Sequence, residues 1–345
     1  MRALTISRHG GLEVLELRDD LPRPALHAST DVRVSVDAVA LNHLDLFLLA
    51  GLPGVTIAPP FIVGTDATGI VTEVGSDVMG VAPGDRVIVN AGMSDRSCEY
   101  CLDGEQPLCP RFHVLGEHVP GLAAEEVVLP AWNVRTIPAS VPVAQAAAFT
   151  LATLTAWRML MTRARLQAGD DVLVWGIGGG VAVAALQVAR RFGARVWVTS
   201  GSDEKLARAR ELGADFTLNH DRDDVPAMVR AQTGKRGVDI VVDSVGEATW
   251  ERSLRALGRR GRLVTCGGTS GPMVTTDVRR LFWNQWDILG STMGNDAEFS
   301  AIAGELAAGR LLPVVDREYP IEEAQSAYAR LKAAGQFGKI VLRMR

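Results

Sequence analysis

The chain has 345 residues, 47% of them hydrophobic and 22% charged, which is the composition of a globular protein long enough for two domains. Its formal net charge of -4 gives no reason to expect nucleic acid or a membrane surface as a partner. The first residues, MRALTISRHGG, lack the apolar core of a signal peptide, and no apolar stretch reaches bilayer-spanning length. We therefore expect a cytoplasmic protein that acts on a small-molecule substrate.

The N-terminal part of the chain is rich in short β-type runs. Residues 1 to about 130 contain VRVSVDAVALN, GIVTEVGSDV, DRVIVNAG and AAEEVVLP, separated by Gly and Pro. This spacing predicts a compact, barrel-like β unit with long inserted loops. Three of the four cysteines lie within a dozen residues of one another in this part, which favours a metal site in a reducing compartment over a disulfide framework.

The pattern changes after about Pro142 to Ala-rich helices, and from Gly169 to residue 292 strands and helices alternate. The stretch from Asp171 to His220 predicts a strand over 171–175, a turn with four glycines within five residues, and a helix that stops at Gly193. A second strand over 195–200 and a second helix over 205–212 follow. Together they form a βαβ unit of the dinucleotide-binding kind.

The glycine turn fits one version of the dinucleotide fingerprint better than another. Read as GxGxxG, its last position is Val181, whereas GxxGxxA is satisfied by Gly176, Gly179 and Ala182. We prefer the second version because it keeps a small residue where helix and strand pack closely. Glycines let the backbone approach a pyrophosphate, which then lies against the helix N-terminus. The expected contacts there are Gly176, Gly179, Gly180 and Val181.

The end of the second strand favours NADP(H) over NAD(H), although NAD(H) stays open. No carboxylate stands where an acidic residue usually bonds the ribose 2′-hydroxyl of NAD. Ser200, Ser202 and Lys205, with His220 at the end of the third strand, suit a 2′-phosphate better. An alternative is that Ser202 and Asp203 only cap the following helix.

The remaining chain predicts further parallel strands and a short return. VDIVVDSVG, GRLVTCGG and WDILGST have the apolar runs of buried parallel strands, each ending in small residues. Residues 298–345 contain two helical patterns and a closing strand, GKIVLRM.

This order of a β-rich domain, a dinucleotide domain and a short return resembles the medium-chain dehydrogenase/reductase superfamily over essentially the whole chain. The segment ALNHLDLFLLAG and the GxxG turn are similar to the quinone oxidoreductase branch, and residues 90–110 are similar to the zinc lobe of alcohol dehydrogenases. The resemblance implies an α/β fold with a GroES-like β-rich catalytic domain at 1–152 and 293–345. It also implies a Rossmann domain with a doubly wound parallel sheet at 153–292.

The resemblance implies one structural zinc. Asp95, Cys98, Cys101 and Cys109 have the spacing of the zinc lobe, with Asp at the first of four Cys positions. A carboxylate oxygen can replace one thiolate in a tetrahedral zinc site. The alternative is a lobe that has lost its metal and keeps half-buried thiols.

The catalytic zinc of the alcohol dehydrogenases has no matching ligand set. The family's ligand positions correspond here to Asn42, Thr65, Leu151 and Asp66. Neutral amide and hydroxyl groups bind zinc poorly and Leu offers no ligand atom, so we expect no catalytic zinc. Without that Lewis acid, the resemblance favours hydride acceptors that delocalise negative charge, namely quinones and α,β-unsaturated carbonyls.

Three residues are expected to serve the substrate. Asn42 would donate to the developing oxyanion, Asp45 would orient the Asn42 loop, and His118 would supply a proton. A structural hydrogen bond of Asp45 and a solvent-facing His118 are the alternatives.

The resemblance also implies further cofactor contacts and an oligomer. His43 would face the pyrophosphate, with an ordinary surface or packing histidine as the alternative. The other expected contacts are Thr155, Val245, Gly267, Ser291, Met293 and Lys339, of which Lys339 would meet a phosphate. A homodimer, or a tetramer, would join at the edge strand near 286–292, beside the cluster Leu281-Phe282-Trp283; an intramolecular core is the alternative for that cluster.

We therefore expect an NADPH-dependent reductase of quinones or activated C=C bonds, with a structural zinc and no catalytic zinc. Two alternatives remain at this point: an alcohol dehydrogenase, and a nucleotide-binding structural or sensor protein that has lost catalysis.

Overall fold

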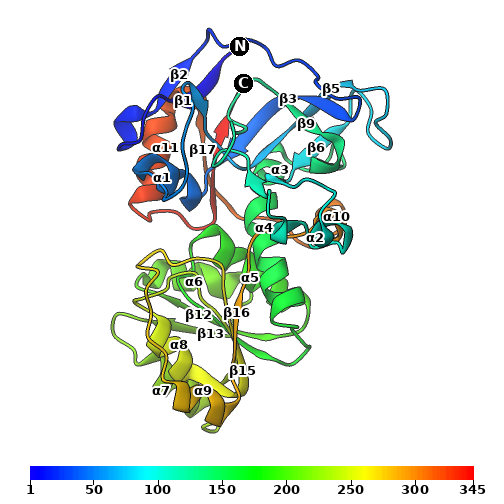
Figure 1. Cartoon of the computed structure of the whole chain (residues 1–345). Helices are drawn as coiled ribbons and strands as arrows, with labels where there is room; N and C mark the ends of the chain where they lie inside the picture. Colours follow the sequence, from blue (N-terminus) through cyan, green and yellow to red (C-terminus); the bar gives the residue numbers. More distant parts are fainter. The chain divides into compact units, whose positions relative to one another are not determined.

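A computed structural model describes residues 1–345. The chain divides into two compact units: unit 1 comprises Met1–Ala152 and Gly294–Arg345, and unit 2 comprises Thr153–Met293 (Figure 1). Helix α4 (Thr150–Trp157) carries the chain from one unit to the other. None of the helices has both the length and the apolar character needed to cross a bilayer.

Unit 1 is built on a seven-stranded sheet in the order β10-β6-β5-β3-β18-β17, with β9 also paired to β3. Its strands are β10 (Val134–Thr136), β6 (Arg86–Val89), β5 (Ala67–Val74), β3 (Asp31–Ala40), β18 (Lys339–Arg343), β17 (Val315–Pro320) and β9 (Glu126–Pro130). A smaller sheet joins β2 (Glu16–Arg18), β1 (Ala3–Ile6) and β4 (Phe61–Ile62). The β-rich first domain is therefore confirmed, and β17 is a strand that the sequence patterns did not indicate.

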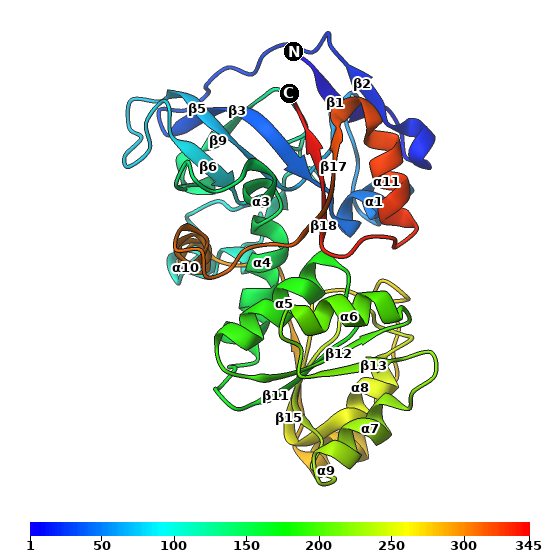
Figure 2. The same ribbon diagram turned by 180° about the vertical axis from the view of Figure 1, so that it is seen from behind.

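The helices of unit 1 are short or come from the C-terminal segment. They are α1 (His43–Ala50), α2 (Glu99–Leu102), α3 (Val143–Ala147), α10 (Asp296–Ala307) and α11 (Ala324–Lys332), with 3₁₀ turns at Leu12–Val14, Gln106–Leu108, Ala131–Asn133 and Ile321–Glu323. Strands β7 (Gly92–Met93) and β8 (His113–Val114) pair across the segment that holds the clustered cysteines. Figure 2 shows α11 and α1 beside each other, and the two helices are in contact.

Unit 2 contains a parallel six-stranded sheet in the order β13-β12-β11-β14-β15-β16. The strands are β13 (Phe216–Asn219), β12 (Arg195–Ser200), β11 (Asp171–Val174), β14 (Val238–Val242), β15 (Leu257–Thr265) and β16 (Asp287–Gly290). The helices are α5 (Gly180–Arg191), α6 (Asp203–Glu211), α7 (Val225–Gln232), α8 (Trp250–Ala256) and α9 (Val278–Asn284), after a π-helical turn at Arg158–Arg163. Figures 1 and 2 show α5 and α6 on one face of the sheet and α7 and α8 on the other, so the doubly wound parallel sheet is confirmed.

The turn chemistry of unit 2 follows the sequence closely. The predicted strand over 195–200 has the bounds of β12, and α5 ends at Arg191, just before Gly193 takes a φ of +81°. Helix α6 begins two residues earlier than predicted, because Ser202 caps it by accepting a hydrogen bond from the Lys205 N–H. The core of this unit includes Leu173 and Trp197, which are fully buried.

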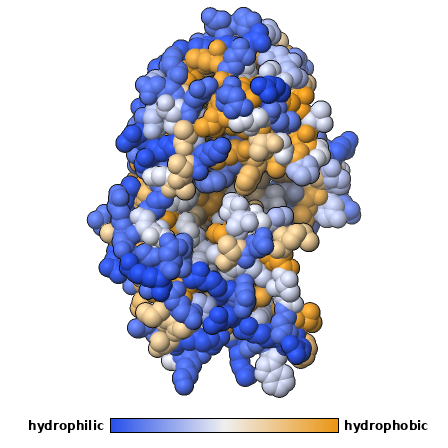
Figure 3. Space-filling view, turned by 90° about the vertical axis from the view of Figure 1, so that its left-hand side faces the viewer, coloured by the Kyte–Doolittle hydropathy of each residue, from blue (hydrophilic) through white to orange (hydrophobic).

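The face drawn in Figure 3 carries mostly hydrophilic side chains, with hydrophobic ones between them. Scattered exposed apolar side chains are ordinary on a protein surface, so no single patch can be assigned a role from hydropathy alone.

Candidate functional site

A buried polar network stands where the resemblance locates the catalytic zinc. The Asn42 Nδ2 group donates to Thr65 Oγ1 at 2.8 Å and to Asp66 Oδ2 at 3.1 Å. The Lys339 ammonium donates to Asp66 Oδ2 at 2.9 Å and also to Asn42 Oδ1. The second carboxylate oxygen of Asp66 accepts from the Leu151 N–H at 2.7 Å. A buried lysine and aspartate thus occupy the position expected for a metal ion.

Strand register brings these distant residues together. Val341 on β18 pairs with Ala40 on β3 in antiparallel fashion. The same register places Lys339, the first residue of β18, opposite Asn42, which lies two residues beyond the end of β3. Asp66 lies next to the same point because the Ala40 N–H donates to the Asp66 carbonyl at 3.0 Å. The ammonium and the carboxylate therefore meet through sheet pairing, although 273 positions separate them in the chain.

The electrostatics of this network leave little capacity for a metal. The side chain of Asp66 is fully buried and that of Lys339 is 4% exposed, so the two charges depend on each other for compensation. The Asp66 carboxylate is already paired with the Lys339 ammonium, and Asn42, Thr65 and Leu151 supply no thiolate, imidazole or carboxylate. The donor set does not fit a zinc ion.

Asn42 was expected to donate a hydrogen bond to the substrate oxygen, but its side-chain amide is already engaged within the protein. Its two amide hydrogens are directed at Thr65 and Asp66, and its carbonyl oxygen accepts from Lys339. An amide has only two N–H donors, so a hydrogen bond from Asn42 to a substrate oxygen would have to replace one of these. The network leaves Lys339, with three N–H groups, as the richer donor.

Asp45 is fully buried and supports the Asn42 backbone. Its Oδ2 atom accepts from the Asn42 N–H at 2.8 Å at the start of α1. Burial raises the pKa of Asp45 to about 7, against the lowering effects of the Asn42 hydrogen bond and the Lys339 charge. Its Oδ1 atom and the hydroxyl of Tyr328 on α11 are both buried without a hydrogen-bond partner. Burial raises the pKa of Tyr328, and the negative charge of Asp45 raises it further.

The two histidines expected at the site lie in different surroundings. His43 follows Asn42 directly, and its pKa is lowered by the surrounding protein and by the positive charge of Lys339. The imidazole Nδ1 of His118 accepts from the Val114 N–H at 3.2 Å, and its ring meets that of His113 edge to face at 5.8 Å. None of the polar contacts of His118 is with Asn42, Asp45 or Lys339, so the structure joins those three and leaves His118 at the turn after β8.

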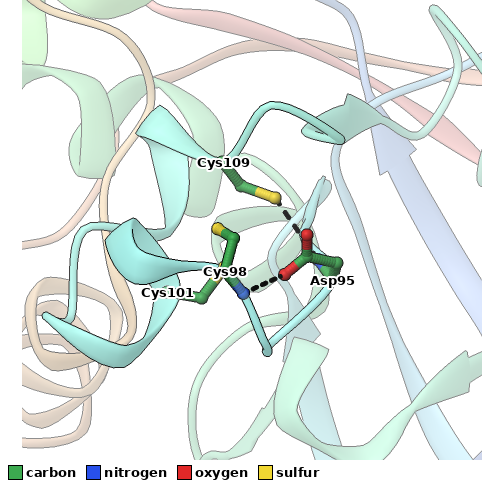
Figure 4. Close-up of side chains that lie close together, drawn as sticks. All are labelled: Asp95, Cys98, Cys101 and Cys109. Carbon is green, nitrogen blue, oxygen red and sulfur yellow. Dashed lines mark hydrogen bonds between the residues drawn. The ribbon is translucent and has the colours of Figure 1, made fainter.

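The cysteine lobe has the arrangement expected of a metal centre (Figure 4). One potential ligand atom from each of Asp95, Cys98, Cys101 and Cys109 lies within 4.8 Å of the others. A tetrahedral zinc with thiolates at about 2.3 Å needs ligand separations of roughly 3.8 Å, so a small contraction brings four ligands onto one ion. These residues fit the metal.

The lobe is held in place by its own hydrogen bonds and by α10. The Asp95 Oδ1 atom accepts from the Ser97 N–H at 2.8 Å and the Cys98 N–H at 2.9 Å, and Asp95 Oδ2 pairs with Arg111 at 2.9 Å. Arg96 forms an ion pair with Asp296 in the first turn of α10. The hydrogen bonds from Ser97, Cys98 and Arg111 therefore keep the Asp95 carboxylate facing the cysteines. Metal-ligating carboxylates are commonly oriented by such additional hydrogen bonds.

The glycine turn of unit 2 has the geometry of a phosphate cradle. Gly176 and Gly178 have φ angles of +69° and +132°, which other residues rarely adopt. Gly179 precedes the first turn of α5, and a Cβ there would meet no atom within 4 Å, so the space above the helix N-terminus is open. The N–H groups of the first turn, including those of Gly180 and Val181, have no carbonyl acceptor within the helix. The residues fit a dinucleotide pyrophosphate.

The strand ends beside this turn bring the residues predicted for the adenosine together. The Ser202 N–H donates to Ser200 Oγ at 3.1 Å, and the imidazole of His220 lies 3.1 Å from Thr199 Oγ1. Asp221 is a neighbour that the sequence analysis missed: a Cβ on Gly201 would lie 2.4 Å from its Oδ2 atom. The usual signal, an acidic residue at the end of the second strand, could not reveal it because Asp221 follows the third strand.

The remaining predicted cofactor residues of unit 2 lie at the ends of successive strands. Val245 follows β14, Gly267 follows β15, and Ser291 and Met293 follow β16. The Ser291 N–H donates to the Thr265 carbonyl at 2.9 Å, while its hydroxyl is buried without a partner. In parallel sheets the carboxyl ends of the strands form one edge, where ligands bind. Thr155 lies buried on α4.

Comparison with known proteins agrees with this architecture. Residues 28–139 match the family described as alcohol dehydrogenase GroES-like domain, and residues 180–308 match zinc-binding dehydrogenase. The chain is 28% identical over 349 residues to quinone oxidoreductase of Rattus norvegicus, covering 99% of this chain and 97% of that protein. It is 31% identical over 345 residues to acryloyl-coenzyme A reductase of Metallosphaera sedula, covering 99% of both.

Among solved structures, a crystal structure of an NAD-dependent alcohol dehydrogenase is 43% identical and superimposes with a TM-score of 0.96 over 100% of both chains. The resemblance inferred from the glycine turn and the cysteine lobe thus extends to the whole sequence and both units. The chain belongs to the medium-chain dehydrogenase/reductase superfamily and is an oxidoreductase, with a GroES-like unit and a Rossmann-like unit.

Proposed function

We propose that the protein reduces quinones or α,β-unsaturated carbonyl compounds with a nicotinamide cofactor and without a catalytic zinc. The observation that carries this proposal is the Asn42, Thr65, Asp66 and Lys339 network, because an ion pair and neutral groups stand where alcohol dehydrogenases need zinc ligands. A conjugated acceptor needs no Lewis acid of that strength, since it spreads the incoming charge over several atoms.

Two of the named relatives support the reduction of conjugated acceptors, and a third favours alcohol oxidation instead. Quinone oxidoreductases and an acryloyl-coenzyme A reductase act, by their names, on conjugated acceptors, whereas the relative of highest similarity named above is called an alcohol dehydrogenase. Alcohol oxidation is therefore the second candidate function. A nucleotide-binding protein without catalysis is a third, which tight cofactor binding with no turnover would favour.

In the proposed reaction a bound nicotinamide supplies a hydride to the substrate. The Asn42 network presents fixed donors to the oxygen on which charge develops, and Asp45 holds the Asn42 backbone in place through its N–H. His118, with its Nδ1 occupied by the Val114 N–H, would carry its exchangeable proton on Nε2 and deliver it from there.

The deciding experiment follows the absorbance of reduced nicotinamide while the protein meets a panel of quinones, enones, aldehydes and alcohols, with zinc counted on the same sample. Turnover of a quinone or enone at one zinc per chain is the expected result. Oxidation of simple alcohols at two zincs per chain would overturn the proposal in favour of an alcohol dehydrogenase.

The single zinc is proposed to sit in the lobe of Asp95, Cys98, Cys101 and Cys109, where it would fix the fold of the loop rather than react. All four cysteines of the chain are free thiols, three of them in the lobe. Thiolate ligation requires a reducing compartment, which agrees with the cytoplasmic location proposed for the protein.

NADP(H) is the proposed cofactor, supported by the hydroxyls of Ser200 and Ser202 and the ammonium of Lys205 near the end of β12. Asp221 favours NAD(H) instead, because a carboxylate beside Gly201 would repel a 2′-phosphate and accept from ribose hydroxyls. The ratio of kcat/KM for NADPH and NADH decides between them, and Asp221→Asn should move that ratio toward NADPH by about tenfold if the carboxylate faces the ribose.

A homodimer is proposed through the open edge of the unit 2 sheet. Strand β16 pairs only with β15, and Ile288 on it is 37% exposed. Beside it, Phe282 and Trp283 on α9 are 63% and 71% exposed, whereas Leu281 packs against the core. Leu281 thus belongs to the core of unit 2, whereas the exposed Phe282 and Trp283 are suited to contact a second copy of the chain. Light scattering of Trp283→Asp against the parent protein tests this pairing.

A further inference from the structure

We propose that the ammonium group of Lys339 takes the place of the catalytic metal and donates a hydrogen bond to the substrate oxygen that becomes anionic. The inference rests on the proposed function, since it assigns the electrophile of that reaction. It gives Lys339 a catalytic role in place of the phosphate contact that the resemblance implies.

The first support is position. The ammonium contacts Asn42 and Asp66, two of the four residues at the expected ligand positions, and Asp66 in turn accepts from the backbone of a third, Leu151. A cation therefore stands at the point where related enzymes need a cation. The charge comes from a side chain on β18 that strand pairing carries to this point.

The second support is the count of donors. A lysine ammonium has three N–H groups, and the structure directs two of them at Asn42 Oδ1 and Asp66 Oδ2. The third has no acceptor within the chain. Both amide hydrogens of Asn42 are used by Thr65 and Asp66, so the ammonium is the group with a donor to spare.

The third support is rigidity. The Lys339 side chain is 4% exposed and fixed by an ion pair with a fully buried carboxylate. A donor held in a water-poor setting stabilises a developing oxyanion more than a mobile one, because no reorganisation is needed when the charge forms. A surface lysine would lack this property.

The proposed step is a two-electron reduction of the substrate by hydride transfer. The C–H bond at the reduced nicotinamide breaks, a C–H bond forms at the substrate carbon, and the π electrons of the conjugated system move onto the substrate oxygen. The substrate is reduced and the cofactor is oxidised by two electrons. The ammonium keeps its proton and donates a hydrogen bond to the oxyanion, and the proton that completes the product comes from Nε2 of His118, as in the proposed reaction.

The test compares Lys339→Met with Lys339→Arg, and it measures hydride transfer in single turnovers at saturating cofactor as well as the cofactor Kd. Lys339→Met should lose about 100-fold to 1000-fold in hydride-transfer rate with an unchanged cofactor Kd, as expected for the loss of an oxyanion donor. Lys339→Arg keeps the charge and should lose about tenfold, since a planar guanidinium fits the space less well. Lys332→Met, at an exposed lysine that ends α11, should match the parent.

The opposite pattern would overturn the inference. A hydride-transfer rate within about threefold of the parent at saturation, with a weakened cofactor Kd, would return Lys339 to a phosphate-binding role. Because a lone buried Asp66 could unfold the single variant, Asp66→Asn/Lys339→Met removes both charges. This double variant should fold, bind cofactor normally and remain slow; a parent-like rate would contradict the role of the charge.

A second readout needs no turnover. 4-Nitrophenol is titrated into the protein with oxidised cofactor, in buffer below the pKa of the free phenol, and its phenolate absorbance is recorded. The parent should bind it as the phenolate, and Lys339→Met should not. If no quinone or enone is reduced but the phenolate forms, the proposed function fails while the oxyanion site stands; no phenolate with the parent protein would overturn the inference.

Discussion

The cysteine lobe and the Asn42 network are the two places where a relative of alcohol dehydrogenases is expected to hold zinc, and they differ in every chemical respect. The lobe brings three thiols and a carboxylate within 4.8 Å of one another. The network offers an amide, a hydroxyl and a carboxylate already paired with Lys339. The comparison teaches that residue type separates the two positions: the lobe has a donor set that fits zinc, whereas the Asp66 carboxylate of the network is already paired with a buried ammonium.

The largest expected effect comes from breaking the lobe. Cys101→Ser should reduce zinc from one per chain to none and lower the melting temperature by on the order of 10 °C, since metal binding and folding of such a loop are coupled. Elemental analysis and thermal unfolding measure both quantities. Cys266→Ser is the control, because Cys266 lies in unit 2 and should leave the zinc in place. A parent protein that carries no zinc would contradict the assignment.

The next effect comes from breaking the buried ion pair of the network. Asp66→Asn or Lys339→Met alone should cost about 3–5 kcal/mol in free energy of unfolding, because each leaves a charge buried without its partner. The double variant should cost less than either single variant. Arg222→Met, which breaks an exposed pair with Asp203, should leave the free energy of unfolding close to that of the parent protein. Urea unfolding of the parent protein and the four variants provides the measurement, and equal losses in all four variants would refute the distinction between the buried and the exposed ion pair.

Asp45 gives the network a pH dependence that extends to neutral pH. The pKa of Asp45 is raised to about 7 in the folded protein. The unfolded chain therefore loses this proton at lower pH than the folded protein does, so the folded state loses stability as pH rises from the pKa of Asp45 in the unfolded chain toward 7. Asp45→Asn cannot ionise, so it should gain stability relative to the parent over that interval, by up to about 4 kcal/mol. Thermal unfolding of both proteins from acidic to slightly alkaline pH measures the gap. Parallel curves would show that Asp45 does not titrate in this way.

The smallest expected effect sharpens the description of the lobe. Arg111 is 68% exposed and pairs with Asp95 Oδ2, so it acts on the metal only through that carboxylate. Arg111→Ala should weaken zinc affinity by about tenfold, because Asp95 loses a hydrogen bond that orients its carboxylate, and it should leave the free energy of unfolding close to that of the parent protein. Competition with a zinc chelator of known affinity measures the first quantity. Complete loss of zinc would mean that Arg111 determines whether Asp95 binds at all.

Sequence patterns were most reliable where local chemistry decides the structure. The glycine turn, the end of α5 before Gly193 and the bounds of β12 depend on neighbouring residues alone, and the structure has them as expected. Strand β17 was not predicted because its sequence, VDREYP, has neither the alternation of apolar and polar residues nor the apolar run of a typical strand. Its place is set by pairing with β18.

The residues of the candidate site differ in the same way, between those that lie close together in the sequence and those that the fold brings together. The four lobe residues lie within one short segment, so their spacing alone was sufficient to propose a shared ligand set, and the structure brings them together. No local pattern could predict the position of Lys339 or that of Tyr328 near Asp45. Lys339 was expected to meet a phosphate, and the structure directs its ammonium at Asn42 and Asp66.

By itself, the sequence determined the family, the order of the two units, the glycine turn and the absence of a zinc ligand set around Asn42, because each depends on residue type and short spacing. Only the tertiary structure decided which group pairs with the Asp66 carboxylate. Antiparallel pairing of β18 with β3 brings residue 339 opposite residue 42, and burial then forces the ammonium and the Asp66 carboxylate to pair. Such a contact is fixed by register and burial, which no stretch of neighbouring residues specifies.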